Sequence, residues 1–585
     1  MTFQLRNIRD IPNIVDAKLL YYHSYYQNLS NKYNLNLFRM RIKSIFAVLL
    51  AIATMASCSD NVEGEGPDTG TGSSGTAYMS LNVTYPTSST KAGSTEEPAE
   101  PDEAAIKEFY VLTFDGSADK KLIKHSNATT YYTKIDGSVT KMLKVNPDTK
   151  YLLVVANPGA KMQNRLGALT ENTKYSDFNE VITLDALGAG ETPDILVKEI
   201  VESVDGSTGI GKHFTMINVG TYDTNSDKWP DDGLLDVGSN VKKVDPQGTY
   251  PNDAAAQAAA SSDKATLKIE RLAAKIEVDA TSAVAATTTY PNAKFEFGAW
   301  ILDYRNSTFF PYAKKTKLDT HNSPAFYENN FYTEDPNYIL DEVGKGHENG
   351  IILNKVDDSK DIPADGLWKD SKGLDYCIEN TMEAKAQKFG AATRLVIKGL
   401  YTPNNTEIPL GTDWFFWDNK AYTIATLKAA YNAAKTDPTE IEKLFIEATD
   451  NFLIEANKIN SNISTSDIDL LDAAQLTTAL IPNGGEITKI NKCLRWYQGG
   501  LNYYYYEIRH DNSDLGNMEF GKYGVVRNNW YNLNLKNVTG KGTPWYPGGG
   551  PEDPDPGEDI DQENAYLDFE IEVGPWVYWT TDFDI

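Results

Sequence analysis

Two stretches far apart in the chain alternate strictly between apolar and polar residues. In residues 77–85 one face carries Ala77, Met79, Leu81, Val83 and Tyr85. In residues 565–573 one face carries Ala565, Leu567, Phe569, Ile571 and Val573. A period of two predicts a β-strand with one buried face. Both stretches begin with Ala-Tyr, so both could occupy the same place in a sheet. The simpler alternative is two ordinary strands of one protein, paired with each other.

The C-terminal stretch is predicted to form a hairpin over residues 565–585. Gly574-Pro575 interrupts the alternation and predicts a turn. The aromatic run that follows includes Trp576 and Trp579 and favours a second strand. Residues 543–564 form an acidic Pro/Gly linker that cannot build a core. We therefore expect the terminal strands to be held away from their own fold and to need the core of another molecule.

Length and composition indicate a β-rich protein of several domains. A chain of 585 residues is too long for one core and predicts two or three domains. Its net charge of −27 argues against nucleic acid as a partner, because phosphates would be repelled. Three cysteines cannot build a disulfide framework. Pairing of Cys377 with Cys493 stays open, although the sequence favours two unpaired buried thiols.

The start of the chain has the features of an exported lipoprotein. Residues 40–57 combine a basic start with a short apolar run, which is typical of a signal peptide. Cys58 follows small residues, as in the lipobox of bacterial lipoproteins, so we expect Cys58 to be acylated. Residues 1–39 lack periodicity and are interpreted as a gene-model extension or an unusual leader. Residues 58–76 are a flexible tether.

A predicted cleavage point follows the first alternating strand. Lys91 stands alone in a small, polar loop, which is the usual setting for proteolysis. Cleavage between Lys91 and Ala92 would remove residues 77–91 as a propeptide strand. The core would then lose one strand and open a groove of the same shape.

Between the two ends the chain predicts two β-domains. Residues 92–252 form an N-terminal β-sandwich, and residues 264–542 form a C-terminal β-sandwich. A helical insertion is expected near 423–456, with an apolar side formed by Leu444, Phe445, Ala448, Phe452 and Ile454. The expected fold class is therefore all-β with one helical insertion.

No motif indicates catalysis, a cofactor or a metal site. The six histidines are scattered without metal-ligand spacing. Residues 223–228 begin like a calcium loop, but Lys228 stands where that loop needs glycine, which favours a polar turn. No nucleophile elbow, P-loop or zinc-protease motif is found in the sequence.

These features together resemble the fimbrillin family, the shaft subunits of Bacteroidota-type (type V) pili, most closely the main subunit of short fimbriae. Four features carry the resemblance: the lipobox at Cys58, the Ala-Tyr-Met-Ser strand from 77, the segment 524–531 (Gly-Val-Val-Arg-Asn-Asn-Trp-Tyr), and the Pro-rich spacer leading to Val573-Gly574-Pro575-Trp576. The resemblance implies two transthyretin-like β-sandwich domains and no catalytic site. It also implies trimming by an Arg- or Lys-specific protease and joining by donor-strand exchange. Family members are usually cut after Arg, whereas this chain offers Lys91.

The expected function is that of a structural subunit of a cell-surface fimbrium that supports adhesion. Its partners would be other copies of itself and related subunits, the maturation protease and, through the lipid, the outer membrane. The alternative is a monomeric surface-anchored carbohydrate-binding or adhesin lipoprotein that keeps its lipid. A secreted enzyme is a more distant third reading.

Overall fold

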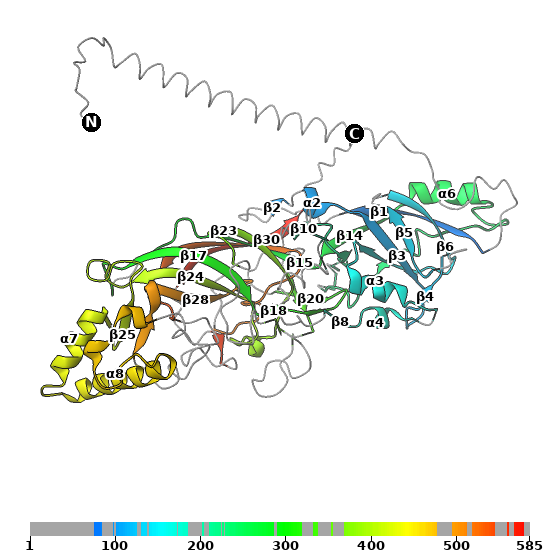
Figure 1. Ribbon diagram of the computed structural model, residues 1–585. Helices are drawn as coiled ribbons and strands as arrows, with labels where there is room; N and C mark the ends of the chain where they lie inside the picture. Colours follow the sequence, from blue (N-terminus) through cyan, green and yellow to red (C-terminus); the bar gives the residue numbers. More distant parts are fainter. Residues whose placement is uncertain are drawn as a thin grey trace, which may run out of the picture. The chain divides into compact units, whose positions relative to one another are not determined.

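The computed structural model describes a chain built mostly of β-strands, with few helices (Figure 1). The described residues are 75–84, 97–98, 101–125, 130–136, 140–171, 173–184, 200, 202–203, 210–220, 222–223, 225–226, 228–285, 289–318, 331–336, 338, 353–354, 368–476, 494–511, 517–544, 558–560 and 567–577.

A ten-stranded sheet organises the N-terminal half. Its strands are β1 (Ala77–Thr84), β3 (Glu108–Phe114), β4 (Leu122–Ile123), β5 (Thr133–Asp136), β6 (Thr140–Val145), β7 (Tyr151–Ala156), β11 (Met216–Asn218), β12 (Leu235–Asp236), β13 (Lys242–Lys243) and β14 (Ala265–Arg271). The main path runs β13-β1-β14-β11-β7-β3-β4. β14 was expected to open the second domain, but it pairs with β1 and β11 in this first sheet. The sheet therefore extends to Arg271.

Short helices accompany this sheet. They are α2 (Pro101–Ala104), α3 (Ala160–Gly167), α4 (Tyr175–Phe178) and α6 (Asp253–Ser262). The Ala-rich stretch before β14, which the sequence left open between helix and connector, is the helix α6. Asn252 caps it, because its side chain accepts a hydrogen bond from the amide of Ala255.

Two further sheets share one core in the C-terminal half. The six-stranded sheet contains β2 (Glu97–Pro98), β15 (Ala273–Asp279), β16 (Val284–Ala285), β23 (Lys372–Ile378), β29 (Asn529–Val538) and β30 (Leu567–Val577). The three-stranded sheet contains β17 (Lys294–Asp303), β24 (Arg394–Thr402) and β28 (Leu501–Glu507). Ile276 and Leu533 of the first sheet pack in the same cluster as Trp300 and Ile397 of the second. Inward-facing side chains from two sheets in one core make a sandwich.

Short ladders complete the described β-structure. They are β8 (Ile182–Thr183) with β19 (Thr308–Phe309), β9 (Glu202–Ser203) with β10 (Ile210–Lys212), β18 (Arg305–Asn306) with β22 (Leu353–Asn354), β20 (Lys314–Lys317) with β21 (Phe331–Glu334), and β25 (Trp414–Trp417) with β26 (Lys420–Tyr422) and β27 (Arg495–Tyr497). Single 3₁₀ turns lie at Ala384–Ala386, Ile468–Leu470, Ala473–Gln475 and Gln498–Gly500.

The expected helical insertion is present as α7 (Ile424–Ala434) and α8 (Glu440–Ile459). Phe445, Ala448 and Phe452 are buried in the core beneath these helices, as predicted. Leu444 and Ile454 are exposed, so that part of the predicted apolar side is wrong. α8 buries one stripe only, and these two residues lie outside it.

Candidate polymerisation site

β1 buries the face that its alternation predicts. Ala77, Met79, Leu81 and Val83 are at most 5% exposed and lie in the core of the first sheet. The fifth predicted residue, Tyr85, lies outside the described residues. The predicted burial of this apolar face is confirmed for the four residues that are described. The expected exposure of the opposite face is wrong, because Tyr78 and Ser80 are buried as well.

β1 has hydrogen-bonded neighbours on both of its edges. β6 runs antiparallel to it from Ala77–Val145 to Asn82–Thr140. On the other edge β13 pairs with Ala77 and Tyr78, and β14 runs parallel over 81–84, where Leu81 lies opposite Ala265. β1 is thus an interior strand, and its removal would leave unpaired backbone groups on both sides of an apolar slot.

The opposite face of β1 is covered by a helix at one end. Tyr78 is 3% exposed and packs with Val244 and with Ala256 and Ala260 of α6. The strand that fills this slot therefore meets the main core on one side and a tyrosine pocket on the other. The alternating pattern alone did not predict this pocket.

Several predicted site residues lie outside the described residues. These are Cys58, Lys91, Ala92, Ala565 and Trp579. Lipidation and cleavage at these positions stay predictions.

The C-terminal strand is not held away from its own fold. β30 pairs antiparallel with β29 of the same chain, from Asn529–Pro575 to Val538–Leu567. Leu567, Phe569, Ile571, Val573 and Trp576 all belong to this strand. The expected detachment is wrong for this chain, because the Pro/Gly linker is long enough to let the strand return to the open edge of β29.

The expected turn at Gly574-Pro575 is also absent from β30. The ladder continues through both residues, with Gly574 opposite Trp530 and Pro575 opposite Asn529. Proline is tolerated here because Asn529 is the first residue of β29, so the ladder ends at this pair. The C-terminal residues 567–577 form one strand rather than a hairpin.

The segment after the predicted cleavage point lies beside this C-terminal strand. β2 pairs parallel with β30, with Glu97 opposite Trp576 and Pro98 opposite Val577. A mature chain that began at Ala92 would keep β2. In that chain β2 would still pair with β30.

Glu103 anchors the same segment, and its role was not evident from the sequence. Its carboxylate accepts a hydrogen bond from the Tyr376 hydroxyl at 2.7 Å and lies 3.2 Å from Nζ of Lys275. Its backbone carbonyl accepts from Nε of Arg271 at 3.0 Å. All four residues are buried. In a strongly acidic stretch nothing distinguishes this glutamate from its exposed neighbours.

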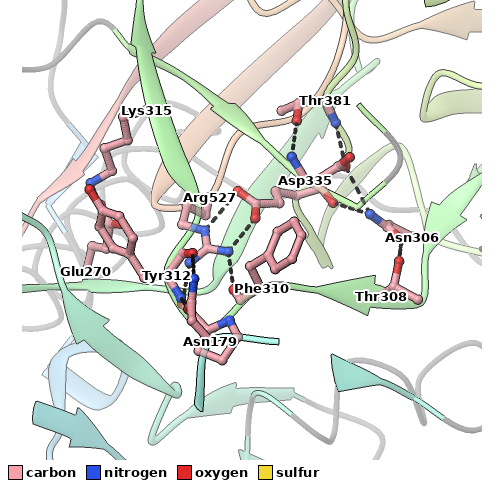
Figure 2. Close-up of polar contacts among 12 residues, drawn as sticks. Asn179, Glu270, Asn306, Thr308, Phe310, Tyr312, Lys315, Asp335, Thr381 and Arg527 are labelled. Atoms are coloured by element: carbon pink, nitrogen blue, oxygen red, sulfur yellow. Dashed lines mark hydrogen bonds and ion pairs between the residues drawn. The ribbon is translucent and has the colours of Figure 1, made fainter. Parts of the chain in front are cut away.

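Arg527 explains why the segment 524–531 is a distinctive motif. Its guanidinium is fully buried and pairs with both carboxylate oxygens of Glu379. It donates to the carbonyl of Pro311 at 2.8 Å and to the carbonyl of Phe310 at 2.8 Å; Figure 2 shows Arg527 beside Phe310. The adjacent Asn528 accepts from the backbone amide of Arg271 at 3.2 Å. These bonds fix the start of β29, the strand on which β30 lies.

A second buried ion pair lies in the same region (Figure 2). Nζ of Lys315 lies 2.7 Å from Oε2 of Glu270 and donates to the carbonyl of Val219 at 2.7 Å. Burial raises the pKa of Glu270 and lowers the pKa of Lys315. Because each partner would be costly to bury alone, the pair locks β14 to β20.

Among the described residues, no helix is long and apolar enough to cross a membrane, and no group of ligands suited to a metal ion is found.

Comparison with known families matches both ends of the chain to fimbrial subunits. Residues 77–221 match the family of the major fimbrial subunit protein (FimA). Residues 495–582 match the C-terminal family of fimbrillin, the major fimbrial subunit protein type IV. The matched regions contain β1 and β30, and the resemblance seen in the sequence is confirmed. The class is that of structural fimbrial subunits. The N-terminal match is to the FimA family, and the C-terminal match is to the fimbrillin family.

Solved structures give weaker likenesses. A fimbrilin from Porphyromonas gingivalis W83 is 14% identical with a TM-score of 0.35, over 86% of this chain and 98% of that chain. The tip fimbrial protein Mfa3 from Porphyromonas gingivalis, with C-terminal truncation, is 11% identical with a TM-score of 0.30, over 86% and 100%. A fimbrial assembly protein from Parabacteroides distasonis is 11% identical with a TM-score of 0.25, over 56% and 86%. No curated protein matches the sequence.

Proposed function

We propose that this structural fimbrial subunit is exported as a lipoprotein, matured by cleavage, and polymerised by donor-strand exchange. Cys58 carries the lipid that holds the precursor at the outer membrane. A Lys- or Arg-specific protease cuts between Lys91 and Ala92. Two transthyretin-like β-sandwich domains form the body of each subunit.

The interior position of β1 is the observation that supports this proposal most. Cleavage after Lys91 would break the only covalent link between β1 and the mature chain, which begins at Ala92. Burial of Met79, Leu81 and Val83 contributes about 1.5–3 kcal/mol for each side chain. Without β1 the subunit would lose this stabilisation together with the ladders to β6 and β14. Another strand must therefore fill the slot.

The C-terminal region 565–585 of a neighbouring copy is the proposed replacement. It carries the same alternation as β1 and follows the acidic Pro/Gly linker 543–564. An added strand forms main-chain bonds along the slot and places alternate side chains in its pockets. Head-to-tail joining of this kind does not close on itself and yields a filament.

A competing peptide tests this mechanism. We expect a synthetic peptide of residues 76–86 to refill the slot of mature subunits and to block their polymerisation. A matched peptide with Met79, Leu81 and Val83 replaced by serine should have no effect. If both peptides inhibited polymerisation equally, or if neither inhibited it, the proposal that removal of β1 leaves an open slot would be refuted.

Deletion of the C-terminal region gives an independent test. A chain lacking 565–585 should still be exported and cut, and should accept the strand of an intact subunit at the end of a filament. Long fibres made of the deletion variant alone would show that another region joins the subunits.

A monomeric surface-anchored carbohydrate-binding or adhesin lipoprotein is the second candidate, because the described strands pair within one chain. β1 fills its own slot and β30 lies on its own β29. Such a protein would keep Cys58 as its acylated N-terminus. A mature protein that begins at Ala92 would exclude it.

A further inference from the structure

Lys315 and Glu270 form a contact that is sealed from solvent. Among the described lysine–carboxylate pairs it is the most deeply buried, with side chains that are 0% and 1% exposed. Nζ of Lys315 lies 2.7 Å from Oε2 of Glu270, and Figure 2 shows the two side chains meeting. The two residues belong to β20 and β14 and are 45 positions apart in the chain. The fold therefore holds an amine and a carboxyl group from distant segments in contact, away from water.

We propose that Lys315 and Glu270 condense to an amide in the folded protein, so that a covalent cross-link joins β20 to β14. Nζ of Lys315 attacks Cδ of Glu270, and the new N–C bond forms as the bond from Cδ to Oε2 breaks. Oε2 leaves as water, which takes two of the ammonium protons, while the third stays on the amide nitrogen. The pair itself supplies every atom and proton of the products, so no oxidant, cofactor or second protein is needed. This inference does not depend on the proposed function.

The distance between the reacting atoms suits this attack. Cδ lies one bond beyond Oε2, and Oε2 is 2.7 Å from Nζ. Cδ is therefore within about 4 Å of Nζ, close to the roughly 3–3.5 Å at which reacting atoms are poised for attack. A small rotation of the carboxyl group brings Cδ to the nitrogen without movement of either strand.

Burial favours the reactive protonation states of both groups. It raises the pKa of Glu270 and lowers the pKa of Lys315. Both shifts favour transfer of one proton from the ammonium to the carboxylate. The transfer leaves a neutral amine, which is the nucleophilic form of lysine, and a carboxylic acid, which is a better electrophile than a carboxylate.

The surroundings of the pair suit the product. Nζ of Lys315 donates to the carbonyl of Val219 at 2.7 Å, and an amide N–H can keep this hydrogen bond. Oε1 of Glu270 is buried and has no hydrogen-bond partner within the described part of the chain. A charged oxygen is costly to bury without a partner, whereas the carbonyl of a neutral amide costs less. Condensation therefore removes two buried charges and retains the one backbone contact.

Three aromatic rings surround the lysine nitrogen. Nζ lies 4.4 Å from the ring centroid of Phe331, 4.9 Å from that of Trp229 and 5.9 Å from that of Tyr312. The rings keep water away from the reaction and from the amide once it has formed. They also attract an ammonium group, so a stable ion pair is the alternative state. The two states differ in mass by one water molecule.

An amide here would close a covalent ring in the chain. The segment from 270 to 315 would stay looped after all non-covalent contacts were lost. Because a cross-link restricts the unfolded chain, it stabilises the folded one. The link would tie β14, the last strand of the first sheet, to the short β20–β21 ladder.

Peptide mapping of the folded full chain tests the cross-link. Trypsin cuts after lysine and arginine, but not after a lysine whose Nζ is part of an amide. We expect residues 269–271 and 315–317 in one branched peptide, whose mass is that of the two peptides less one water. The variant Lys315→Arg keeps a cation beside Glu270 but has no amine to react. In that variant the two segments should appear only as separate peptides.

Two comparisons exclude a link made during handling. Lys443 and Glu440 form an exposed ion pair at 2.6 Å, so the tryptic peptide 436–443 should keep its full mass. Full chain that is isolated and digested in urea without being folded should give only unlinked peptides. If the folded chain also gave only unlinked peptides, the inference would be overturned and the contact would be a stable ion pair. A link in the urea sample, or loss of water from 436–443, would overturn it too, because neither depends on the buried geometry.

Discussion

The hydroxyl of Tyr376 donates a hydrogen bond to the carboxylate of Glu103 at 2.7 Å, and so ties the segment after the proposed cleavage point to strand β23 of the second sheet. Lys275 of β15 lies on the same carboxylate at 3.2 Å. Removal of β1 would therefore leave the new N-terminal segment fastened beside the C-terminal strand.

Glu103 is expected to be essential for stability. Glu103→Ala leaves Lys275 buried without its carboxylate and should lower the free energy of unfolding by about 3–5 kcal/mol. Tyr376→Phe removes one hydrogen bond and should cost about 1–3 kcal/mol. Urea unfolding of the purified chain measures both. The control is Glu440→Ala, whose exposed pair with Lys443 should contribute less than about 1 kcal/mol. A Glu103 variant as stable as the control would contradict the anchoring role.

The ion pair of Arg527 and Glu379 should show strong coupling. Arg527→Met leaves the Glu379 carboxylate buried and unpaired, with an expected loss of about 3–5 kcal/mol in unfolding free energy. Adding Glu379→Leu removes the stranded charge and should recover part of the loss. A double-mutant cycle measured by urea unfolding tests this. Additive losses would mean that the two side chains act independently.

His125 should make the first sheet sensitive to acid. Burial lowers the pKa of His125 to about 4, and its Nδ1 is hydrogen-bonded to Thr133. In the unfolded chain the pKa is about 6.5, so below that pH the unfolded state takes up a proton that the folded state refuses. Stability should fall between pH 6.5 and 4, by about 3 kcal/mol at the lower end.

In the variant His125→Gln, the free energy of unfolding should depend less on pH between 6.5 and 4. Unfolding of the two proteins would be compared in urea at half-unit steps of pH, since carboxylates contribute equally to both. Parallel profiles from pH 6.5 to 4 would show that His125 is not the sensing group.

Two adjacent residues of α8 should respond in opposite ways to truncation. Phe445 is 4% exposed in the core of the insertion, so Phe445→Ala should cost about 3–5 kcal/mol. Leu444 is 59% exposed, so Leu444→Ala should change stability by less than about 0.5 kcal/mol. Thermal unfolding followed by circular dichroism compares them. A larger loss of stability for Leu444→Ala than for Phe445→Ala would show that Leu444 belongs to the buried side of α8, as the helical spacing predicts.

Local patterns in the sequence predicted the local elements well. The alternation of 77–85 gave the buried face of β1, and the capped, apolar-periodic stretches gave α7 and α8. What the sequence could not supply was pairing between distant segments. The parallel contact of β1 with β14 moved the boundary of the first sheet, because strand composition does not identify a partner. For the same reason, a flexible linker before β30 did not reveal whether that strand would return to β29.

The sequence did not predict which charged residues are buried. Glu103 stands in an acidic stretch and Lys315 in a lysine-rich one, so neither differs in composition from exposed neighbours. Only the fold shows that Glu103 meets Tyr376 and that Lys315 meets Glu270. The motif around Arg527 stands out in the sequence only by resemblance, and the buried pair with Glu379 is its physical reason.

We propose that β1 is a temporary strand, present in the precursor and absent from the assembled subunit. The N-terminus of the protein isolated from surface fimbriae, determined by mass spectrometry, tests this most directly. We expect Ala92 as the first residue, and an uncut chain that does not polymerise when Lys91 is replaced by alanine. An acylated Cys58 at the start of the fimbrial protein would contradict the account.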